Sequence, residues 1–248
     1  FEGETYAEML ARLGIDICLG VALPLHPRPG QPITSTVRHL EHEPGWILVF
    51  RNIRSAIYLR RNEENAGNLR RFAAYYAQNG IPFDLEKGFE PAKVIARAEP
   101  WAIDHGVIPV DFTQLVTGVR QTRAQSTLDS SIHRLSMIYS ALGLYDGAAK
   151  LDRSILRLDR RDAFAARRLL WNLMQLGRFD EAKEAALKIE RGPLGEEVGD
   201  RWSTSMENIL ALGDTDDRAR TVSRARTVTS RARTGSVRPR APTFTRLI

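Results

Sequence analysis

The residue types that most often do covalent chemistry are scarce in this chain. It has one cysteine, Cys18, and five histidines among 248 residues. A thiol nucleophile needs a histidine within hydrogen-bond reach and a third group that orients the imidazole. His26 is the histidine closest in sequence, but eight residues of extended strand span roughly 26 Å. We therefore expect Cys18 to be a small buried apolar residue and not a nucleophile.

A second group of reactive types lies in the segment RHLEHEP, which brings His39, Glu41 and His42 together. Two imidazoles three residues apart could begin a metal site, but a structural zinc site takes four ligands and no third one is in view. We therefore expect a solvated loop, with no metal and no other cofactor. The chain also lacks a glycine-rich phosphate loop and a paired-carboxylate signature.

The strongest pattern is an internal repeat. The stretches LGLYDGAAK and LGRFDEAKE begin at Leu142 and Leu176 and share Leu, Gly, an aromatic residue, Asp and Ala. Apolar residues recur at helical spacing before each glycine, and a second helical run follows it. Each unit therefore predicts a helix, a tight turn and a second helix, over residues 129–159 and 163–191.

These units resemble the tetratricopeptide repeat, whose period is about 34 residues, the spacing from Leu142 to Leu176, and whose small residues lie where paired helices touch. The resemblance covers residues 129–193, and Ala148 and Ala182 fill the small site after each turn. The chain departs from the family at the eighth position of each unit, where Ser136 and Leu170 replace Gly or Ala. The alternative is an unrelated helical bundle with an accidental period.

Two repeats rarely bury enough surface alone, because a solenoid usually needs at least three. The stretch RWSTSMENILALGDTDDRART, which begins at residue 201, reads as a degenerate third unit. Further helical segments are expected at 89–106 and 110–123. We therefore predict a mainly α fold, with a short tetratricopeptide-like α-solenoid over residues 89–217.

The first 80 residues predict a small α/β domain. A helix is expected at 5–13, apolar strands at 15–23 and 45–53, and a second helix at 56–78. The strands follow from short apolar runs bounded by Pro and Gly, and the helices from apolar residues at helical spacing.

The stretch LARLGIDICLGVALPLH, followed by GWILVFRN, resembles transglutaminase-like proteins of bacteria and plastids that carry C-terminal tetratricopeptide repeats. The resemblance implies that His26 takes the place of the family's histidine, whereas the family's Asp falls on Leu48. The family's nucleophilic Cys is expected at or before the first helix, where FEGETY offers only Thr5. The resemblance therefore implies either a degenerate domain without chemistry, with His26 as the only catalytic candidate, or a thiol hydrolase or transferase whose nucleophile lies upstream of Phe1.

Charge is distributed unevenly along the chain. Since the whole chain carries +6 and residues 218–248 hold nine arginines and no acid, residues 1–217 carry −3. Arg-rich, low-complexity sequence has too little apolar surface to fold alone. We expect this basic tail to bind an acidic protein surface. A nucleic-acid backbone is the alternative partner, because the single aromatic residue of the tail, Phe244, argues only against the stacking of single-stranded bases.

We therefore predict that the protein acts by binding partners at its surface, as a non-enzymatic interaction or scaffold subunit of a larger assembly. In a tetratricopeptide stack the first helix of each unit lines a concave groove, and Trp, Arg and Met suit protein interfaces. The alternative for Trp171 and Met174 is packing against a neighbouring helix. The predicted partner-binding residues are His133, Met137, Phe164, Arg167, Trp171, Met174, Arg218, Arg220, Arg224, Arg226, Arg231 and Arg233.

Two features bear on the compartment. The longest uncharged apolar run, 17–25, contains Pro24 and is too short for a membrane helix. A single cysteine cannot form an internal disulfide, which fits a reducing intracellular compartment, either the cytoplasm or the interior of an organelle. Because the chain begins at Phe1, a removed plastid or mitochondrial targeting peptide stays an open alternative.

The repeat register places Ala182 at a helix crossing. Ala182→Leu should overpack this crossing and lower the free energy of unfolding by about 1–3 kcal/mol. Thermal denaturation of the two chains measures the loss, and an unchanged melting temperature would show that the register is wrong.

Overall fold

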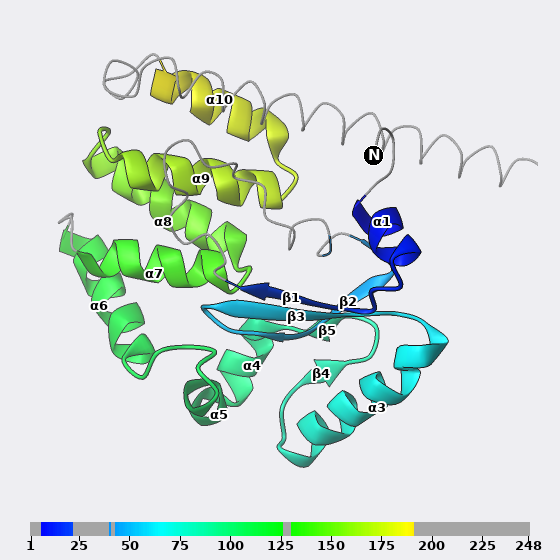
Figure 1. The fold of residues 1–248 in the computed structure, drawn as a ribbon. Coiled ribbons are helices and arrows are strands. Elements are labelled where there is room, and N and C mark those ends of the chain that lie inside the picture. The colour runs from blue at the N-terminus through cyan, green and yellow to red at the C-terminus, as the bar shows by residue number, and fades with distance from the viewer. Residues whose placement is uncertain (1–5, 22–39, 41–42, 126–129, 191–248) are drawn as a thin grey trace, which may run out of the picture. The chain divides into compact units, whose positions relative to one another are not determined.

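The computed structural model describes residues 6–21, 40, 43–125 and 130–190, all within one compact unit that spans residues 1–203. This part of the chain is mainly helical with a small sheet near its N-terminus, as the sequence predicted (Figure 1). His26, His39, the expected third unit and the expected basic tail lie outside the described residues.

The sheet has three antiparallel strands in the order β1-β3-β2. They are β1 (Ile17–Val21), β2 (Trp46–Arg51) and β3 (Ser55–Arg60). The first two agree with the predicted strands. The third shows that the helix predicted over 56–78 begins too early.

Strand β3 forms because its side chains alternate between two buried faces of the sheet. Tyr58 packs on one face and Leu59 on the other. Successive side chains of a strand point to opposite faces, whereas the apolar side chains of an amphipathic helix gather on one side. The preceding turn depends on Asn52, whose Oδ1 accepts hydrogen bonds from the backbone N–H groups of Arg54 and Ser55 at 2.8 and 2.7 Å. This Asx turn ends β2 and starts β3.

Helices cover both faces of the sheet (Figure 1). Helix α3 (Glu63–Gln78) begins after Asn62, whose side chain accepts the backbone N–H of Asn65 at 2.9 Å. It packs through apolar side chains against one face of the sheet. Helix α1 (Tyr6–Arg12) packs Leu10 against the other face.

A buried aromatic cluster joins the sheet to the following helices. Tyr76 lies at its centre, donates a hydrogen bond from its hydroxyl to the carbonyl of Val49 at 2.7 Å, and has a pKa raised by burial. The core continues from this cluster into the helix pairs and so crosses the predicted boundary between residues 80 and 89. The elements of this junction are β4 (Phe83–Asp84), β5 (Gly88–Phe89), α4 (Pro91–Arg97), α5 (Glu99–Asp104) and α6 (Phe112–Gln125).

Four helices form the two predicted pairs, and each contacts the next along the chain. They are α7 (Ser130–Ala141), α8 (Tyr145–Leu158), α9 (Ala163–Gln175) and α10 (Phe179–Glu190). Figure 1 shows them stacked in order beside the sheet.

The internal repeat is present in the backbone as well as in the sequence. Gly143 and Gly177 end the first helix of each pair with φ values of 77° and 68°. The N–H of Leu144 bonds to the carbonyl of Tyr139 at 2.8 Å, and one repeat later Arg178 makes the same bond to Leu173 at 2.9 Å. The turns are therefore structural repeats, and Ala182 is buried as the register requires.

Strands β4 and β5 pair antiparallel and form a hairpin. This hairpin approaches the sheet closely at Gly88, where φ is 81° and a Cβ atom would overlap the backbone oxygen of Leu48. Gly80 has a similar φ of 67°, with no described atom near its Cβ position. Gly80→Ala should therefore lower the free energy of unfolding by about 1–2 kcal/mol through backbone strain alone. Gly88→Ala should cost about 1–3 kcal/mol more through overpacking. Urea denaturation measures both, and equal losses would refute the close approach.

Candidate functional site

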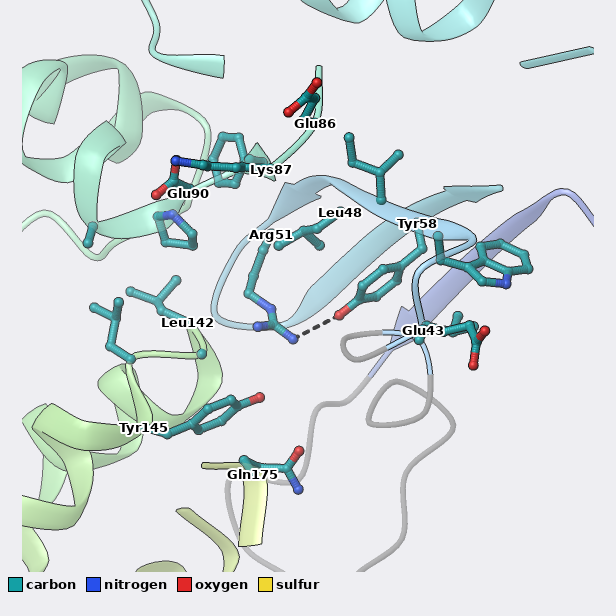
Figure 2. A pocket seen from close by; sticks show the side chains of 18 of the residues that line it. Glu43, Leu48, Arg51, Tyr58, Glu86, Lys87, Glu90, Leu142, Tyr145 and Gln175 are labelled. Carbon is teal, nitrogen blue, oxygen red and sulfur yellow. Dashed lines mark hydrogen bonds between the residues drawn. The ribbon is translucent and has the colours of Figure 1, made fainter. Parts of the chain in front are cut away.

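A cleft of about 820 Å³ opens between the sheet, the hairpin and the helix turns (Figure 2). Cavities of this size are typical of small-molecule sites. The described residues that line it are Leu40, Glu43, Pro44, Trp46, Ile47, Leu48, Arg51, Tyr58 and Arg61 from the sheet region, Glu86, Lys87, Phe89, Glu90, Pro91 and Ala92 from the hairpin and α4, and Leu142, Gly143, Leu144, Tyr145, Gln175 and Leu176 from the turns that end α7 and α9.

The charge most deeply buried in this cleft belongs to Arg51, the last residue of β2, which is 3% exposed. Its Nη2 donates a hydrogen bond to the hydroxyl of Tyr58 at 3.1 Å. Its Nη1 lies so close to Gly143 that a Cβ atom there would overlap it. Gly143 therefore supplies both the positive φ that ends α7 and the space for the guanidinium. The C-terminal end of a helix is also electrostatically favourable for a cation.

Two further polar side chains reach the cleft from helix ends. Tyr145 is the first residue of α8, and Gln175 is the last residue of α9 and is buried. In Figure 2 the guanidinium of Arg51 points toward the side where Tyr145 and Gln175 lie. Hydroxyl, amide and guanidinium groups from the sheet and from both helix pairs thus line one side of the cleft.

The rest of the cleft wall carries charges of both signs. Glu86, Lys87 and Glu90 lie on the side of the cleft from which the Arg51 guanidinium points away (Figure 2). Glu90 also forms an ion pair with Lys93 at 2.5 Å. The charged side chains among the described lining residues therefore do not give the wall one sign.

The catalytic candidates from the sequence do not meet in the described structure. Leu48, which stands where the resemblance has Asp, lines the cleft with its apolar side chain. Cys18, which was expected to be buried, is half-buried in β1 and packs beside Tyr58. His26 lies outside the described residues, so its role stays a prediction.

The described ranges hold neither a candidate metal site nor a candidate membrane span. No three side chains of the metal-binding types gather there to hold an ion. Nor does any helix in those ranges combine the length and the apolar character that crossing a bilayer takes.

The predicted partner-binding residues of α9 differ in exposure. Trp171 and Met174 are buried, which fits the alternative in which they pack inside the protein. Phe164 is 58% exposed, and the guanidinium of Arg167 lies 5.2 Å from the centre of its ring. The exposed Phe164 and the half-buried Arg167 therefore lie in the first turns of α9.

The two predicted residues of α7, His133 and Met137, are both half-buried. The Nε2 atom of His133 lies 3.3 Å from a carboxylate oxygen of Asp162. Asp162 also caps α9, because its side chain accepts the backbone N–H of Ala165 at 2.7 Å. His133 therefore contacts the start of α9.

A buried polar network, which sequence reasoning missed, holds three helices together. Asp152 of α8 is fully buried, and its Oδ1 accepts hydrogen bonds from Nε and Nη2 of Arg168 at 2.8 and 2.5 Å. Its other oxygen accepts from Asn172 at 3.1 Å, and Ser136 of α7 donates to Oδ1 at 2.6 Å. Burial raises the pKa of the Asp152 carboxyl, while the charge and hydrogen bonds of Arg168 oppose that rise.

Comparison of the chain with protein-family models, with curated proteins and with solved structures finds no match.

Because the Asp152–Arg168 pair is buried, removing one partner leaves an uncompensated charge. Arg168→Met and Asp152→Leu should each lower the free energy of unfolding by about 3–5 kcal/mol, and the double variant should lose much less than the sum. Urea denaturation of the four chains measures the coupling.

The matched control is Arg153–Glu181, a half-exposed pair at 2.6 Å between α8 and α10. Its coupling should not exceed about 1 kcal/mol. Additive losses at Asp152 and Arg168, or equal coupling for the two pairs, would contradict the role given to the buried pair.

Proposed function

We propose that this chain is a non-enzymatic interaction protein, a subunit or scaffold that binds a protein partner through the exposed start of α9. The observation that supports this most directly is the Phe164–Arg167 pair. A large aromatic ring that is 58% exposed, with a guanidinium over its face, combines two residue types that are enriched at protein interfaces. Covering this ring with a partner would remove apolar surface from water.

The turn before α9 indicates the charge of the partner. Arg157 at the end of α8 and Arg160 and Arg161 in the turn are exposed, and they outnumber the one exposed acid there, Asp159, whose Oδ1 accepts the backbone N–H of Arg161 at 2.9 Å. The carboxylate of Asp162 is engaged by His133 and by the helix start. Leu158 adds exposed apolar surface in the same turn. A partner segment that carries acidic groups beside an apolar side chain matches this surface, because opposite charges steer and orient the encounter.

We also propose that the helix pairs belong to the tetratricopeptide repeat family and extend into a short solenoid. The repeated turn, with its glycine and its backbone hydrogen bond recurring in the second pair, supports this assignment. The third unit expected after residue 200 would continue the stack.

The two other functions considered from the sequence depend on residues outside the described ranges. A thiol hydrolase or transferase would need His26 and a nucleophile upstream of Phe1, and Leu48 supplies no carboxylate to orient the imidazole. Binding of nucleic acid would use the nine arginines of residues 218–248. Both stay predictions.

Phe164→Ser tests the proposed surface. We expect proteins captured from an extract of the native cells by the unaltered full chain to be lost from this variant, because the exposed ring is removed. Quantitative mass spectrometry of the captured proteins measures the loss. Leu187→Ser is the matched control, since Leu187 is an exposed apolar residue on α10.

Both substitutions should leave the melting temperature nearly unchanged, because neither side chain is buried. Identical capture by all three chains would contradict the proposal. Capture that disappears after nuclease treatment, and is unaffected by Phe164→Ser, would instead favour binding of nucleic acid by the tail.

A further inference from the structure

We propose that strand β1 is the interface of a two-fold dimer, in which the β1 strands of two copies of this chain pair antiparallel and join their sheets. Within the described ranges, β1 pairs on one side only, with β3, and so lies at the edge of the sheet (Figure 1). The inference uses none of the residues at the start of α9, so it goes beyond the proposed function and does not depend on it.

The backbone of β1 presents hydrogen-bonding groups on the side away from β3. The register places Asp16 opposite Arg60, and the N–H of Arg60 donates to the carbonyl of Asp16 at 2.8 Å. Hydrogen-bonded and non-hydrogen-bonded pairs alternate along an antiparallel ladder, so every second residue after Asp16 bonds to β3 and the residues between them point their N–H and C=O groups outward. These outward residues are Ile17, Leu19 and Val21.

The same edge carries exposed apolar side chains. Ile17 and Leu19 are 56% and 57% exposed. They stand opposite Leu59 and Ile57, and residues directly opposite each other share one face of a sheet. Ile17 and Leu19 therefore extend the apolar face on which α3 packs. A further strand beside β1 would bring apolar side chains against both and remove their surface from water.

Strand β1 lacks the features by which edge strands usually avoid pairing. It has no charged residue and no proline, and its register with β3 is regular. The strand at the other side of the sheet, β2, has an irregular register between Leu48 and Phe50, ends in the charged Arg51, and is approached by the hairpin at Gly88. Because only one edge is suited to pairing, a two-fold contact there gives a closed dimer and not a filament.

The chemistry of this edge matches that of a second copy. When the two strands pair about Leu19, the backbone of Leu19 meets the same residue of the second copy, and the backbone of Ile17 meets that of Val21. All three outward residues then form hydrogen-bonded pairs, each with two bonds. No like charges oppose each other, because β1 carries none. A charged partner strand, by contrast, would find no opposite charge in β1.

Sedimentation equilibrium of the full chain at increasing concentration tests the dimer. Small interfaces are typical of weak and reversible association, so we expect a monomer–dimer equilibrium with a Kd of about 10–100 µM. The amide hydrogens of Ile17 and Leu19 should exchange more slowly as the concentration rises, because they become bonded in the dimer.

Opposite charges at the two-fold axis test the register. Leu19→Lys and Leu19→Glu each place like charges opposite each other, so each should weaken association about tenfold. An equimolar mixture of the two variants should associate again, because only the mixed dimer has opposite charges at the axis. Leu85→Lys is the matched control, since Leu85 is 50% exposed in the hairpin and its loss should leave association unchanged.

The mixture separates a second copy from other occupants of the edge, because a different protein or another segment of the same chain would not restore association. A chain that stays monomeric at about 200 µM, unweakened association of Leu19→Lys, or no association in the mixture would overturn the proposal. Circular dichroism checks that the variants fold. If one does not, the exchange of the Ile17 and Leu19 amides in the unaltered chain decides, and exchange that is independent of concentration would overturn the proposal.

Discussion

The placement of both ends of α9, its exposed start and its end at the cleft, depends on the buried pair of Arg168 and Asp152. Removing two charges from water is costly unless each is paired and hydrogen-bonded, and here Ser136 and Asn172 complete the bonds of the carboxylate. Because these groups come from α7, α8 and α9, the bonds form only when the three helices are in register. Arg168 lies near the middle of α9, so this register fixes the exposed start of the helix and its end at the cleft.

A second constraint joins the helix pairs to the sheet. The guanidinium of Arg51 occupies the space left by the absent side chain of Gly143, at the turn that ends α7. The same glycine lets the chain take a positive φ, so one residue type meets a backbone and a packing requirement at once. The cleft lies between the end of β2, the ends of α7 and α9, and the hairpin, which approaches the sheet at Gly88.

Sequence periodicity predicted the helix pairs because each is a local element with a strong apolar pattern, and the glycine at each turn marked its end. The start of α3 was placed too early, since the run from Ala56 was not recognised as a strand, although Asn52 and Asn62 carry the signals of a turn and of a helix cap. The burial of Asp152 and of Arg51 could not be predicted, because a charged residue in a helix or at a strand end is normally exposed to solvent. Their partners, Arg168 and Gly143, lie on other elements of the fold, beyond the reach of a local pattern.

Hydrogen exchange along α9 in Arg168→Lys tests most directly whether the buried pair positions the whole helix. Lysine keeps the charge but cannot make the two bonds that Nε and Nη2 make to Asp152, while Arg167→Lys changes a half-buried neighbour outside the network. The account predicts that Arg168→Lys speeds amide exchange at both ends of α9, near Phe164 and near Gln175, whereas Arg167→Lys does not. Faster exchange confined to the residues around position 168, or an equal effect of the two substitutions, would contradict it.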